Sequence, residues 1–288
     1  MFKYGFMSNV MVANGKKELD KIMKWAKEKG FNGVEVGPTI PLNKDLFQKT
    51  QAEYGVKVAA LTYCRNFLSH NEKEAEEHKK ALTERIHFAS ELSIPVIVTS
   101  TGIDKRIEEV YDRADAIRKI PRRSLEQVIE VFKPIIELAE SKGVKIAFEN
   151  CPLMGNIAIS PIIWRELFEK LNSQNVGLCY DPSHLVWQMI DPYRPIAEFG
   201  DKIFHFHAKD TQVDQERLSE VGILTDFSWW RACIPGEGSL DWRRILDELQ
   251  KIDYQGFISV EHEDTNYEGS IDKVEQGIWL AKEYLKGV

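Results

Sequence analysis

Short apolar segments alternate with amphipathic segments along the whole chain. The apolar segments are KYGF, GVEV, VKVAALTY, PVIVTS, VKIAFE, VGLCYD, IFHFHA and FISVE, and a segment with helical periodicity follows each of them. Nearly continuous apolar strands of this kind are typical of a parallel sheet that is covered by helices. Eight successive strand–helix units therefore predict an α/β fold, a closed (β/α)₈ TIM barrel.

The boundaries of the helical segments fit this arrangement. Ser124 and Gln127 have the spacing of a capping box, which predicts a helix over 124–142. No Gly/Ser-rich linker and no break in composition separates the strand–helix units. We therefore expect residues 1–288 to form a single barrel domain.

Two connections are longer than the others. Residues 103–123 follow the fourth strand and residues 211–239 follow the seventh, and both are expected on the catalytic face of the barrel. The second connection contains Trp229, Trp230 and Arg231. This aromatic cluster either packs the loop against the barrel or covers a sugar or polyol, and we take Trp229 and Arg231 as candidate substrate contacts.

The last four strands each end in a residue that can bind a metal ion. These residues are Glu149, Asp181, His207 and Glu261. Active sites of TIM barrels form where the carboxyl ends of several strands meet. Three carboxylates and one imidazole suit a hard or borderline divalent ion, so we expect Mn²⁺, while Mg²⁺, Co²⁺, Fe²⁺ and Zn²⁺ stay open.

The segment FHFHAKD, residues 204–210, shows how one strand can serve both the core and this site. Side chains alternate between the two faces of a strand. The polar set is expected inside the barrel and the apolar set against the helices: His205, His207 and Lys209 inside, and Phe204, Phe206 and Ala208 outside. We expect His207, which lies nearer the mouth, to bind the metal, and His205, one layer deeper, to support the site.

Strand alternation places two more polar side chains, those of Lys209 and Glu35, toward the barrel interior. Lys209 either contacts a substrate oxygen or remains solvated at the mouth. Glu35, in GVEVG, either hydrogen-bonds a substrate hydroxyl or forms a salt bridge. We retain both as candidate substrate contacts.

At this point the chain resembles the xylose isomerase-like barrels, which include sugar isomerases and epimerases, inosose-processing enzymes and endonuclease IV. The resemblance covers essentially the whole chain and rests on FEN, YDPSHL, HFHAKD, IPGEGSLDW and ISVEHED, in that order. It implies that Glu149, Asp181, His207 and Glu261 are the metal ligands. It also implies that Glu149 and Glu261 exchange protons with the substrate and that His184 contacts it.

The resemblance implies a divalent-metal-dependent isomerase or epimerase of a keto-sugar or cyclitol. A metal-stabilised enediolate would form when one glutamate removes a proton and the other returns it. Ketohexose 3-epimerases of the family commonly carry Glu and Arg where this chain has Gly155 and Val213. The alternative is a lyase or dehydratase that uses the same site for β-elimination, as inosose dehydratases and keto-glycoside lyases do.

Composition and strand-end residues argue against other classes of function. Lys and Arg number 38 and Asp and Glu 45, which gives a net charge of −7 and argues against a nucleic-acid partner. An endonuclease IV-like nuclease would also need histidines at the first four strand ends, where this chain has none. A non-catalytic sugar-binding protein is disfavoured by the complete ligand set.

Apolar runs and cysteine spacing in the sequence bear on the cellular location of the protein. The chain has no apolar run long enough for a membrane helix, and its four cysteines show no CxxC spacing. We therefore expect a cytoplasmic protein that acts on a small sugar or polyol. Members of the family often form dimers or tetramers, but no homo-oligomer interface can be recognised in the sequence.

Overall fold

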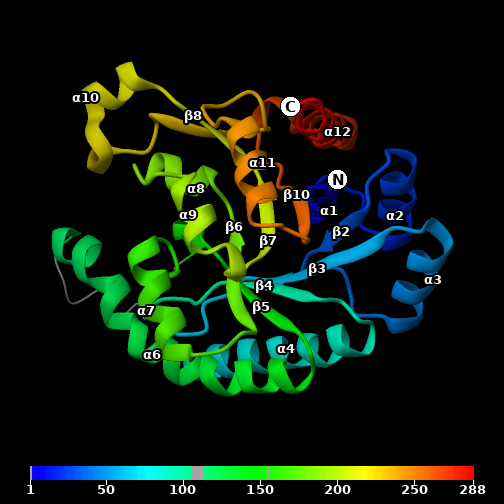
Figure 1. The fold of residues 1–288 in the computed structure, drawn as a ribbon, viewed down its shortest axis with the longest axis horizontal. Coiled ribbons are helices and arrows are strands. Elements are labelled where there is room, and N and C mark those ends of the chain that lie inside the picture. Colours follow the sequence, from blue (N-terminus) through cyan, green and yellow to red (C-terminus); the bar gives the residue numbers. More distant parts are fainter. Residues whose placement is uncertain (1, 105–112, 155) are drawn as a thin grey trace.

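Eight parallel strands form a barrel in the computed structural model, which describes residues 2–104, 113–154 and 156–288 (Figure 1). Their order around the barrel is β1-β10-β7-β6-β5-β4-β3-β2. The strands are β1 Lys3–Phe6, β2 Gly33–Val36, β3 Lys57–Tyr63, β4 Val96–Thr99, β5 Lys145–Glu149, β6 Val176–Tyr180, β7 Ile203–Ala208 and β10 Phe257–Val260. The predicted TIM barrel fold is confirmed.

The first and second strands of the chain close the barrel. A parallel bridge pairs Met7 with Glu35, and the backbone N–H of Ser8 donates to the carbonyl of Glu35 at 2.9 Å. This seam is shorter than the ladders between the other strands, so the backbone of Glu35 is part of the closure.

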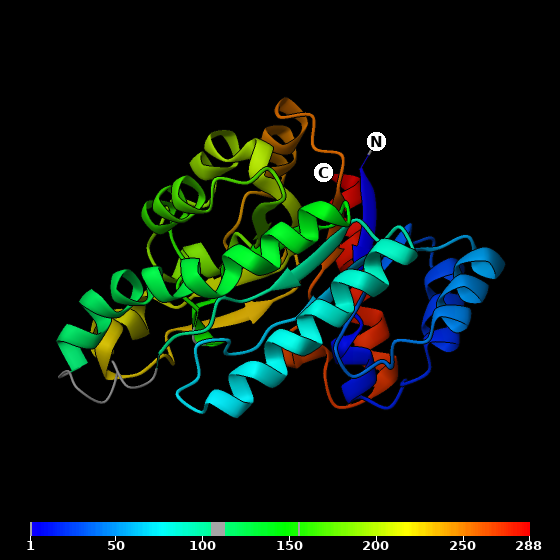
Figure 2. The ribbon, with the colours of Figure 1, turned by 90° about the horizontal axis from the view of Figure 1, so that it is seen from below.

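Helices surround the strands on their outer side, as Figures 1 and 2 show. The longer ones are α2 Leu19–Glu28, α3 Lys44–Tyr54, α4 Glu72–Glu91, α6 Arg113–Ser141, α7 Pro161–Leu171, α11 Trp242–Lys251 and α12 Ile271–Gly287. Short helices follow β1 and β6: α1 Asn9–Ala13, α8 Ser183–Trp187 and α9 Arg194–Glu198. None of the helices in the described ranges combines the length and apolar character of a membrane span.

The connection after β4 differs from the expectation. Helix α6 already includes residue 113, so Ser124 lies inside the helix and does not cap it. Gln127 donates instead to Asp104 at 2.8 Å, which ties the helix to the end of β4. Of the predicted loop 103–123, residues 105–112 and the side chains of 113–123 lie outside the described part of the chain.

The core has two layers, and one phenylalanine belongs to a different layer than predicted. Phe206 points outward and packs against Tyr180 and Trp242, as alternation predicts. Phe204 instead fills the barrel interior beside Ala147 and Cys179. The reason is a bulge, because Leu178 pairs with Ile203 and Cys179 with His205, which leaves Phe204 as the extra residue.

The predicted long connection 211–239 forms most of a β-hairpin with a helix between its strands. Strands β8 Asp210–Val213 and β9 Trp230–Cys233 pair antiparallel, and α10 Gln215–Thr225 lies between them. The buried Asp210 anchors this hairpin. Its carboxylate accepts hydrogen bonds from Nε1 of Trp242 at 2.8 Å and from the backbone N–H groups of Thr211, Gly236 and Leu240.

We predict that Asp210→Ala destabilises the protein by about 2–4 kcal/mol, because it leaves these buried donors without an acceptor. Urea unfolding followed by circular dichroism measures the change. Asp241→Ala is the control, since the carboxylate of this exposed N-cap of α11 accepts a hydrogen bond from the N–H of Arg244 and its loss costs about 1 kcal/mol. Equal effects of the two substitutions would contradict the role given to Asp210.

Candidate active site

The four predicted metal ligands meet at the carboxyl ends of their strands. Glu149 ends β5, Asp181 follows β6, His207 lies on β7 and Glu261 follows β10. One potential ligand atom from each lies within 4.8 Å of the others, and all four side chains are buried. Glu149 and Glu261 also line a cavity of about 440 Å³, together with His184, Lys209 and Trp230.

The arrangement fits a divalent cation. Nδ1 of His207 lies 3.3 Å from a carboxylate oxygen of Glu149 and 3.1 Å from one of Glu261. Neither Nδ1 of His207 nor Oδ2 of Asp181, both buried, has a hydrogen-bond partner among the described residues. Buried polar atoms are seldom left unpaired, and oxygen-rich sets with one imidazole suit hard or borderline divalent ions. A cation bound by the four residues would satisfy both atoms.

Lys209 supplies positive charge beside the ligands. Its Nζ lies 2.8 Å from Glu261, 3.2 Å from Asp181 and 3.0 Å from Glu263. It also lies 3.2 Å from Nε2 of His184. The ammonium group is therefore held at the cavity beside His184, and the substrate contacts expected of Lys209 and His184 stay predictions.

The two glutamates differ in their electrostatic surroundings. Burial, followed by repulsion from Glu261, raises the pKa of Glu149. Burial also opposes ionisation of Glu261, but Lys209 and His207 outweigh burial and hold its pKa well below the usual value. Neighbouring carboxyls whose pKa values are pushed apart are suited to different roles in acid–base chemistry. Glu149 is thus the better proton carrier of the pair.

Backbone and amide contacts fix the ligands in place. Asn150, in FEN, donates from Nδ2 to the carbonyl of Asp181 at 2.8 Å, and its Oδ1 accepts from the N–H of Asp181 at 2.7 Å. The N–H of Ser183 donates to the Asp181 carboxylate at 2.8 Å. The thiol of Cys64 lies 3.6 Å from Glu149 Oε2. The side-chain amide of Asn150, for which no role was predicted from the sequence, therefore joins the ends of β5 and β6.

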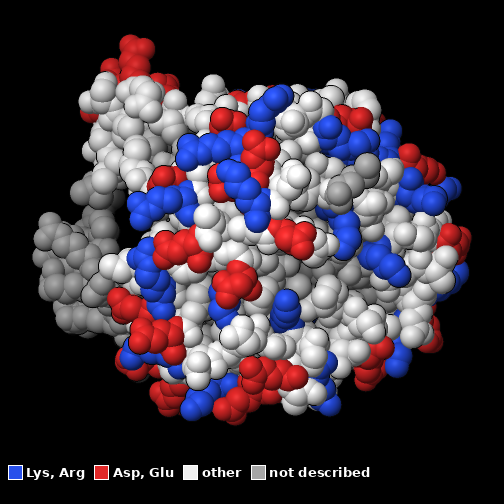
Figure 3. All heavy atoms as spheres, viewed as in Figure 1, with Lys and Arg blue, Asp and Glu red and all other residues white. Residues whose placement is uncertain are grey.

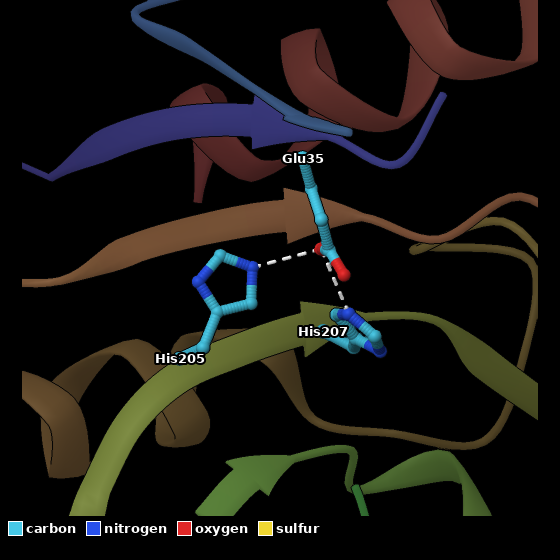
Figure 4. Close-up of side chains that lie close together, drawn as sticks. All are labelled: Glu35, His205 and His207. Atoms are coloured by element: carbon cyan, nitrogen blue, oxygen red, sulfur yellow. Dashed lines mark hydrogen bonds and ion pairs between the residues drawn. The ribbon is translucent and has the colours of Figure 1, made fainter. Parts of the chain in front are cut away.

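Of the two roles expected for Glu35, the structure shows the salt bridge and not the substrate contact. Its carboxylate is fully buried beneath His207, and Oε2 lies 2.8 Å from Nε2 of His205 and 2.9 Å from Nε2 of His207 (Figure 4). Thr62 donates to its other oxygen. Glu35 therefore does not reach the cavity as a substrate contact, whereas His205 has the deep supporting position that was predicted.

The aromatic cluster of the β8–β9 hairpin also differs from the expectation. Trp229 is 1% exposed and belongs to the packed core of the loop, and Arg231 pairs with Asp264 at 3.2 Å. Trp230 lines the cavity instead, stacked on Trp187 with ring centroids 4.8 Å apart. Trp187 in turn donates to Nδ1 of His184 at 3.3 Å. Trp230, and not Trp229 or Arg231, is the aromatic wall.

Charged side chains of both signs are interspersed over the face of the molecule in Figure 3. Nucleic-acid binding relies on clustered Lys and Arg that neutralise phosphates. The mixed surface on this face, together with the net charge of −7, gives no support to a nuclease.

Comparison with known proteins agrees with this geometry. The family model described as xylose isomerase-like TIM barrel matches residues 23–284. An inosose dehydratase of Clostridium perfringens is 24% identical over 81% of this chain and 78% of its own. The inosose dehydratase of Geobacillus thermodenitrificans has the same identity and coverage.

Among solved structures, the IOLI protein with a bound zinc atom has a TM-score of 0.74 at 21% identity, over 99% of this chain and 98% of that one. The 3-keto-D-glucoside 4-epimerase YcjR of E. coli has a TM-score of 0.73 at 16% identity, and the alignment covers both chains completely. At these identities the structural likeness demonstrates the shared fold.

We predict that a divalent metal stabilises the protein. At about 100 times the dissociation constant, free Mn²⁺ should add about 2.7 kcal/mol to the free energy of unfolding of chelator-treated protein. Thermal unfolding with and without the ion measures this gain. Asp181→Asn should abolish most of it, while Glu268→Gln, on the loop after β10, should keep it. Equal stabilisation of both variants would place the ion elsewhere.

Proposed function

The chain belongs to the xylose isomerase-like TIM barrel family, and we propose that it is a divalent-metal-dependent enzyme that moves the proton next to the carbonyl of a keto-sugar or cyclitol. The proposed outcome is isomerisation or epimerisation, with Mn²⁺ as the native ion. The observation that carries this proposal is the convergence of Glu149, Asp181, His207 and Glu261, whose potential ligand atoms lie within 4.8 Å of one another.

The metal would be held by these four residues, and when bound it supplies a Lewis acid that polarises the substrate carbonyl. Glu149 and Glu261 come from β5 and from the end of β10, which lie on either side of β7 and β6 in the barrel order. They therefore approach a substrate in the cavity from two sides. One carboxylate removes the α-proton, and the other returns a proton to the opposite face or to the neighbouring carbon.

Lys209 and His184 complete the floor. Lys209 is charged and hydrogen-bonded to Glu261, so it favours negative charge that develops on a nearby substrate oxygen. Burial, followed by the charge of Lys209, lowers the pKa of His184 to about 3. A neutral imidazole at this place hydrogen-bonds a substrate hydroxyl without adding charge.

A dehydratase is the second candidate, and the inosose dehydratase relatives favour it. Dehydration begins with the same removal of an α-proton and differs in the next step, when a β-hydroxyl leaves. The same glutamates would serve both reactions.

We predict that the protein exchanges the α-proton of its substrate with solvent. In D₂O, a screen of keto-sugars, inososes and 3-keto-glycosides with Mn²⁺-loaded protein should give deuterium at the α-carbon, detected by NMR and mass spectrometry. Glu149→Gln and Glu261→Gln should each slow this exchange about 10²–10⁴-fold, because each removes a proton-transfer group.

Glu268→Gln is the control and should exchange at the wild-type rate. Ketose turnover without a new chromophore supports isomerisation or epimerisation, whereas an enone absorbance supports dehydration. Full exchange activity in both glutamate variants would refute the proposed acid–base pair.

We further predict that Trp230→Ala raises KM about tenfold and changes kcat little, because the aromatic wall contributes to binding and not to proton transfer. Trp230→Phe keeps a ring at this position and should recover most of the loss. Steady-state kinetics on the best substrate of the screen measures both constants. A fall in kcat alone would contradict a binding role.

A further inference from the structure

The buried cluster of Glu35, His205 and His207 (Figure 4) shares His207 with the four-ligand site. His207 belongs to both groups: its Nδ1 faces Glu149 and Glu261, and its Nε2 faces Glu35 at 2.9 Å. Through its two ring nitrogens, His207 therefore contacts the proposed metal site on one side and the Glu35 carboxylate on the other.

We propose that Glu35 is a positioning residue for the metal site, which accepts the Nε2 proton of His207 and thereby keeps the Nδ1 lone pair directed at the cation. This inference rests on the metal site proposed above and not on the reaction that occurs there. It replaces the substrate contact that the sequence suggested for Glu35.

The hydrogen-bond pattern supports this role. A carboxylate only accepts hydrogen bonds, so the Nε2 atoms of His205 and His207, at 2.8 and 2.9 Å from the same oxygen, must both donate. With its proton on Nε2, a neutral His207 presents a bare Nδ1. That atom is buried and has no hydrogen-bond partner in the described part of the chain, as expected for an atom that binds a metal.

The position of Glu35 is fixed from several directions. Its backbone forms the seam of the barrel through the bridge to Met7, and its second carboxylate oxygen accepts from Thr62. Its pairing partner on β3 is the small Ala60, next to an irregularity that shifts the register between Val34 and Glu35. The carboxylate is thus held in a fixed orientation across the interior from β7.

The same cluster contains three groups that could themselves bind an ion, but its distances argue against this use. Contacts of 2.8 and 2.9 Å between the nitrogens and one carboxylate oxygen are those of hydrogen bonds. An ion between the groups would need each ligand atom to face it separately. The chain should therefore bind one equivalent of metal at these two clusters together.

The test measures the affinity of chelator-treated protein for Co²⁺ by competition with a chromophoric chelator, together with the visible spectrum of the bound ion. Glu35→Leu removes the acceptor and should weaken binding about 10–100-fold and alter the spectrum. Glu35→Gln keeps a carbonyl oxygen that can accept both protons, and it should restore most of the affinity. Ser259→Ala is the control, because this buried hydroxyl in the barrel interior bonds to none of the residues that the structure describes.

Nuclear magnetic resonance of Zn²⁺-loaded wild-type protein with ¹⁵N-labelled histidine provides a readout that does not depend on how well Glu35→Leu folds. The proton of His207 should be found on Nε2, and a proton on Nδ1 would overturn the inference. Equal Co²⁺ affinity of wild type, Glu35→Leu and Glu35→Gln would also overturn it, as would a second metal equivalent that disappears in Glu35→Leu. Wild-type protein that bound no metal would refute the proposed function and this inference together.

Discussion

The accumulation of buried negative charge at one end of the barrel is the constraint on which the rest of the site depends. Glu35, Glu149, Asp181 and Glu261 are all nearly inaccessible to solvent. Burying an ionised carboxylate costs several kcal/mol unless a positive charge or a set of donors offsets it. Lys209 and the two strand histidines offset part of this cost, at distances of about 3 Å. Among the described residues, Nδ1 of His207 and Oδ2 of Asp181 have no hydrogen-bond partner, although Lys209 lies 3.2 Å from the latter, and a cation bound there would complete the offset.

The parallel barrel brings these charges together. The carboxyl ends of all eight strands meet at one rim, so residues more than 100 positions apart in sequence, such as Glu149 and Glu261, become neighbours. Strand alternation then divides β7 into an outer face with Phe206 and an inner face with His205 and His207. Residues on the inner face also lie at different distances from the mouth of the barrel. His207 contacts Glu149 and Glu261 at the strand ends, and His205, one layer deeper, contacts the carboxylate of Glu35.

The sequence was sufficient for the barrel and for the four residues that converge, because both follow from periodicity and from strand ends. It was not sufficient to choose between the two roles of Glu35. The alternation of side chains along a strand indicates that Glu35 faces inward, but not how far it lies from the mouth of the barrel. Trp229 was chosen over Trp230 because the antiparallel pairing of β8 with β9 depends on contacts across 211–239 that no local pattern reveals. Phe204 was misplaced because a bulge against β6 breaks the alternation. Each error arose where a non-local contact overrides a local rule.

Under the proposed function, the division of the site into a floor and walls would let one barrel serve either isomerisation or dehydration. The floor is built from strand ends and would support the removal of the α-proton, which both reactions share. The wall is built from the β8–β9 hairpin and the helix after β6, where Trp230 and Trp187 stack. The step after enolisation would depend on whether a proton donor or an apolar surface of the wall stands beside the next oxygen. Loops tolerate change far better than strands that carry buried charge. The reaction can therefore diverge at the wall while the electrostatic balance at the floor is maintained.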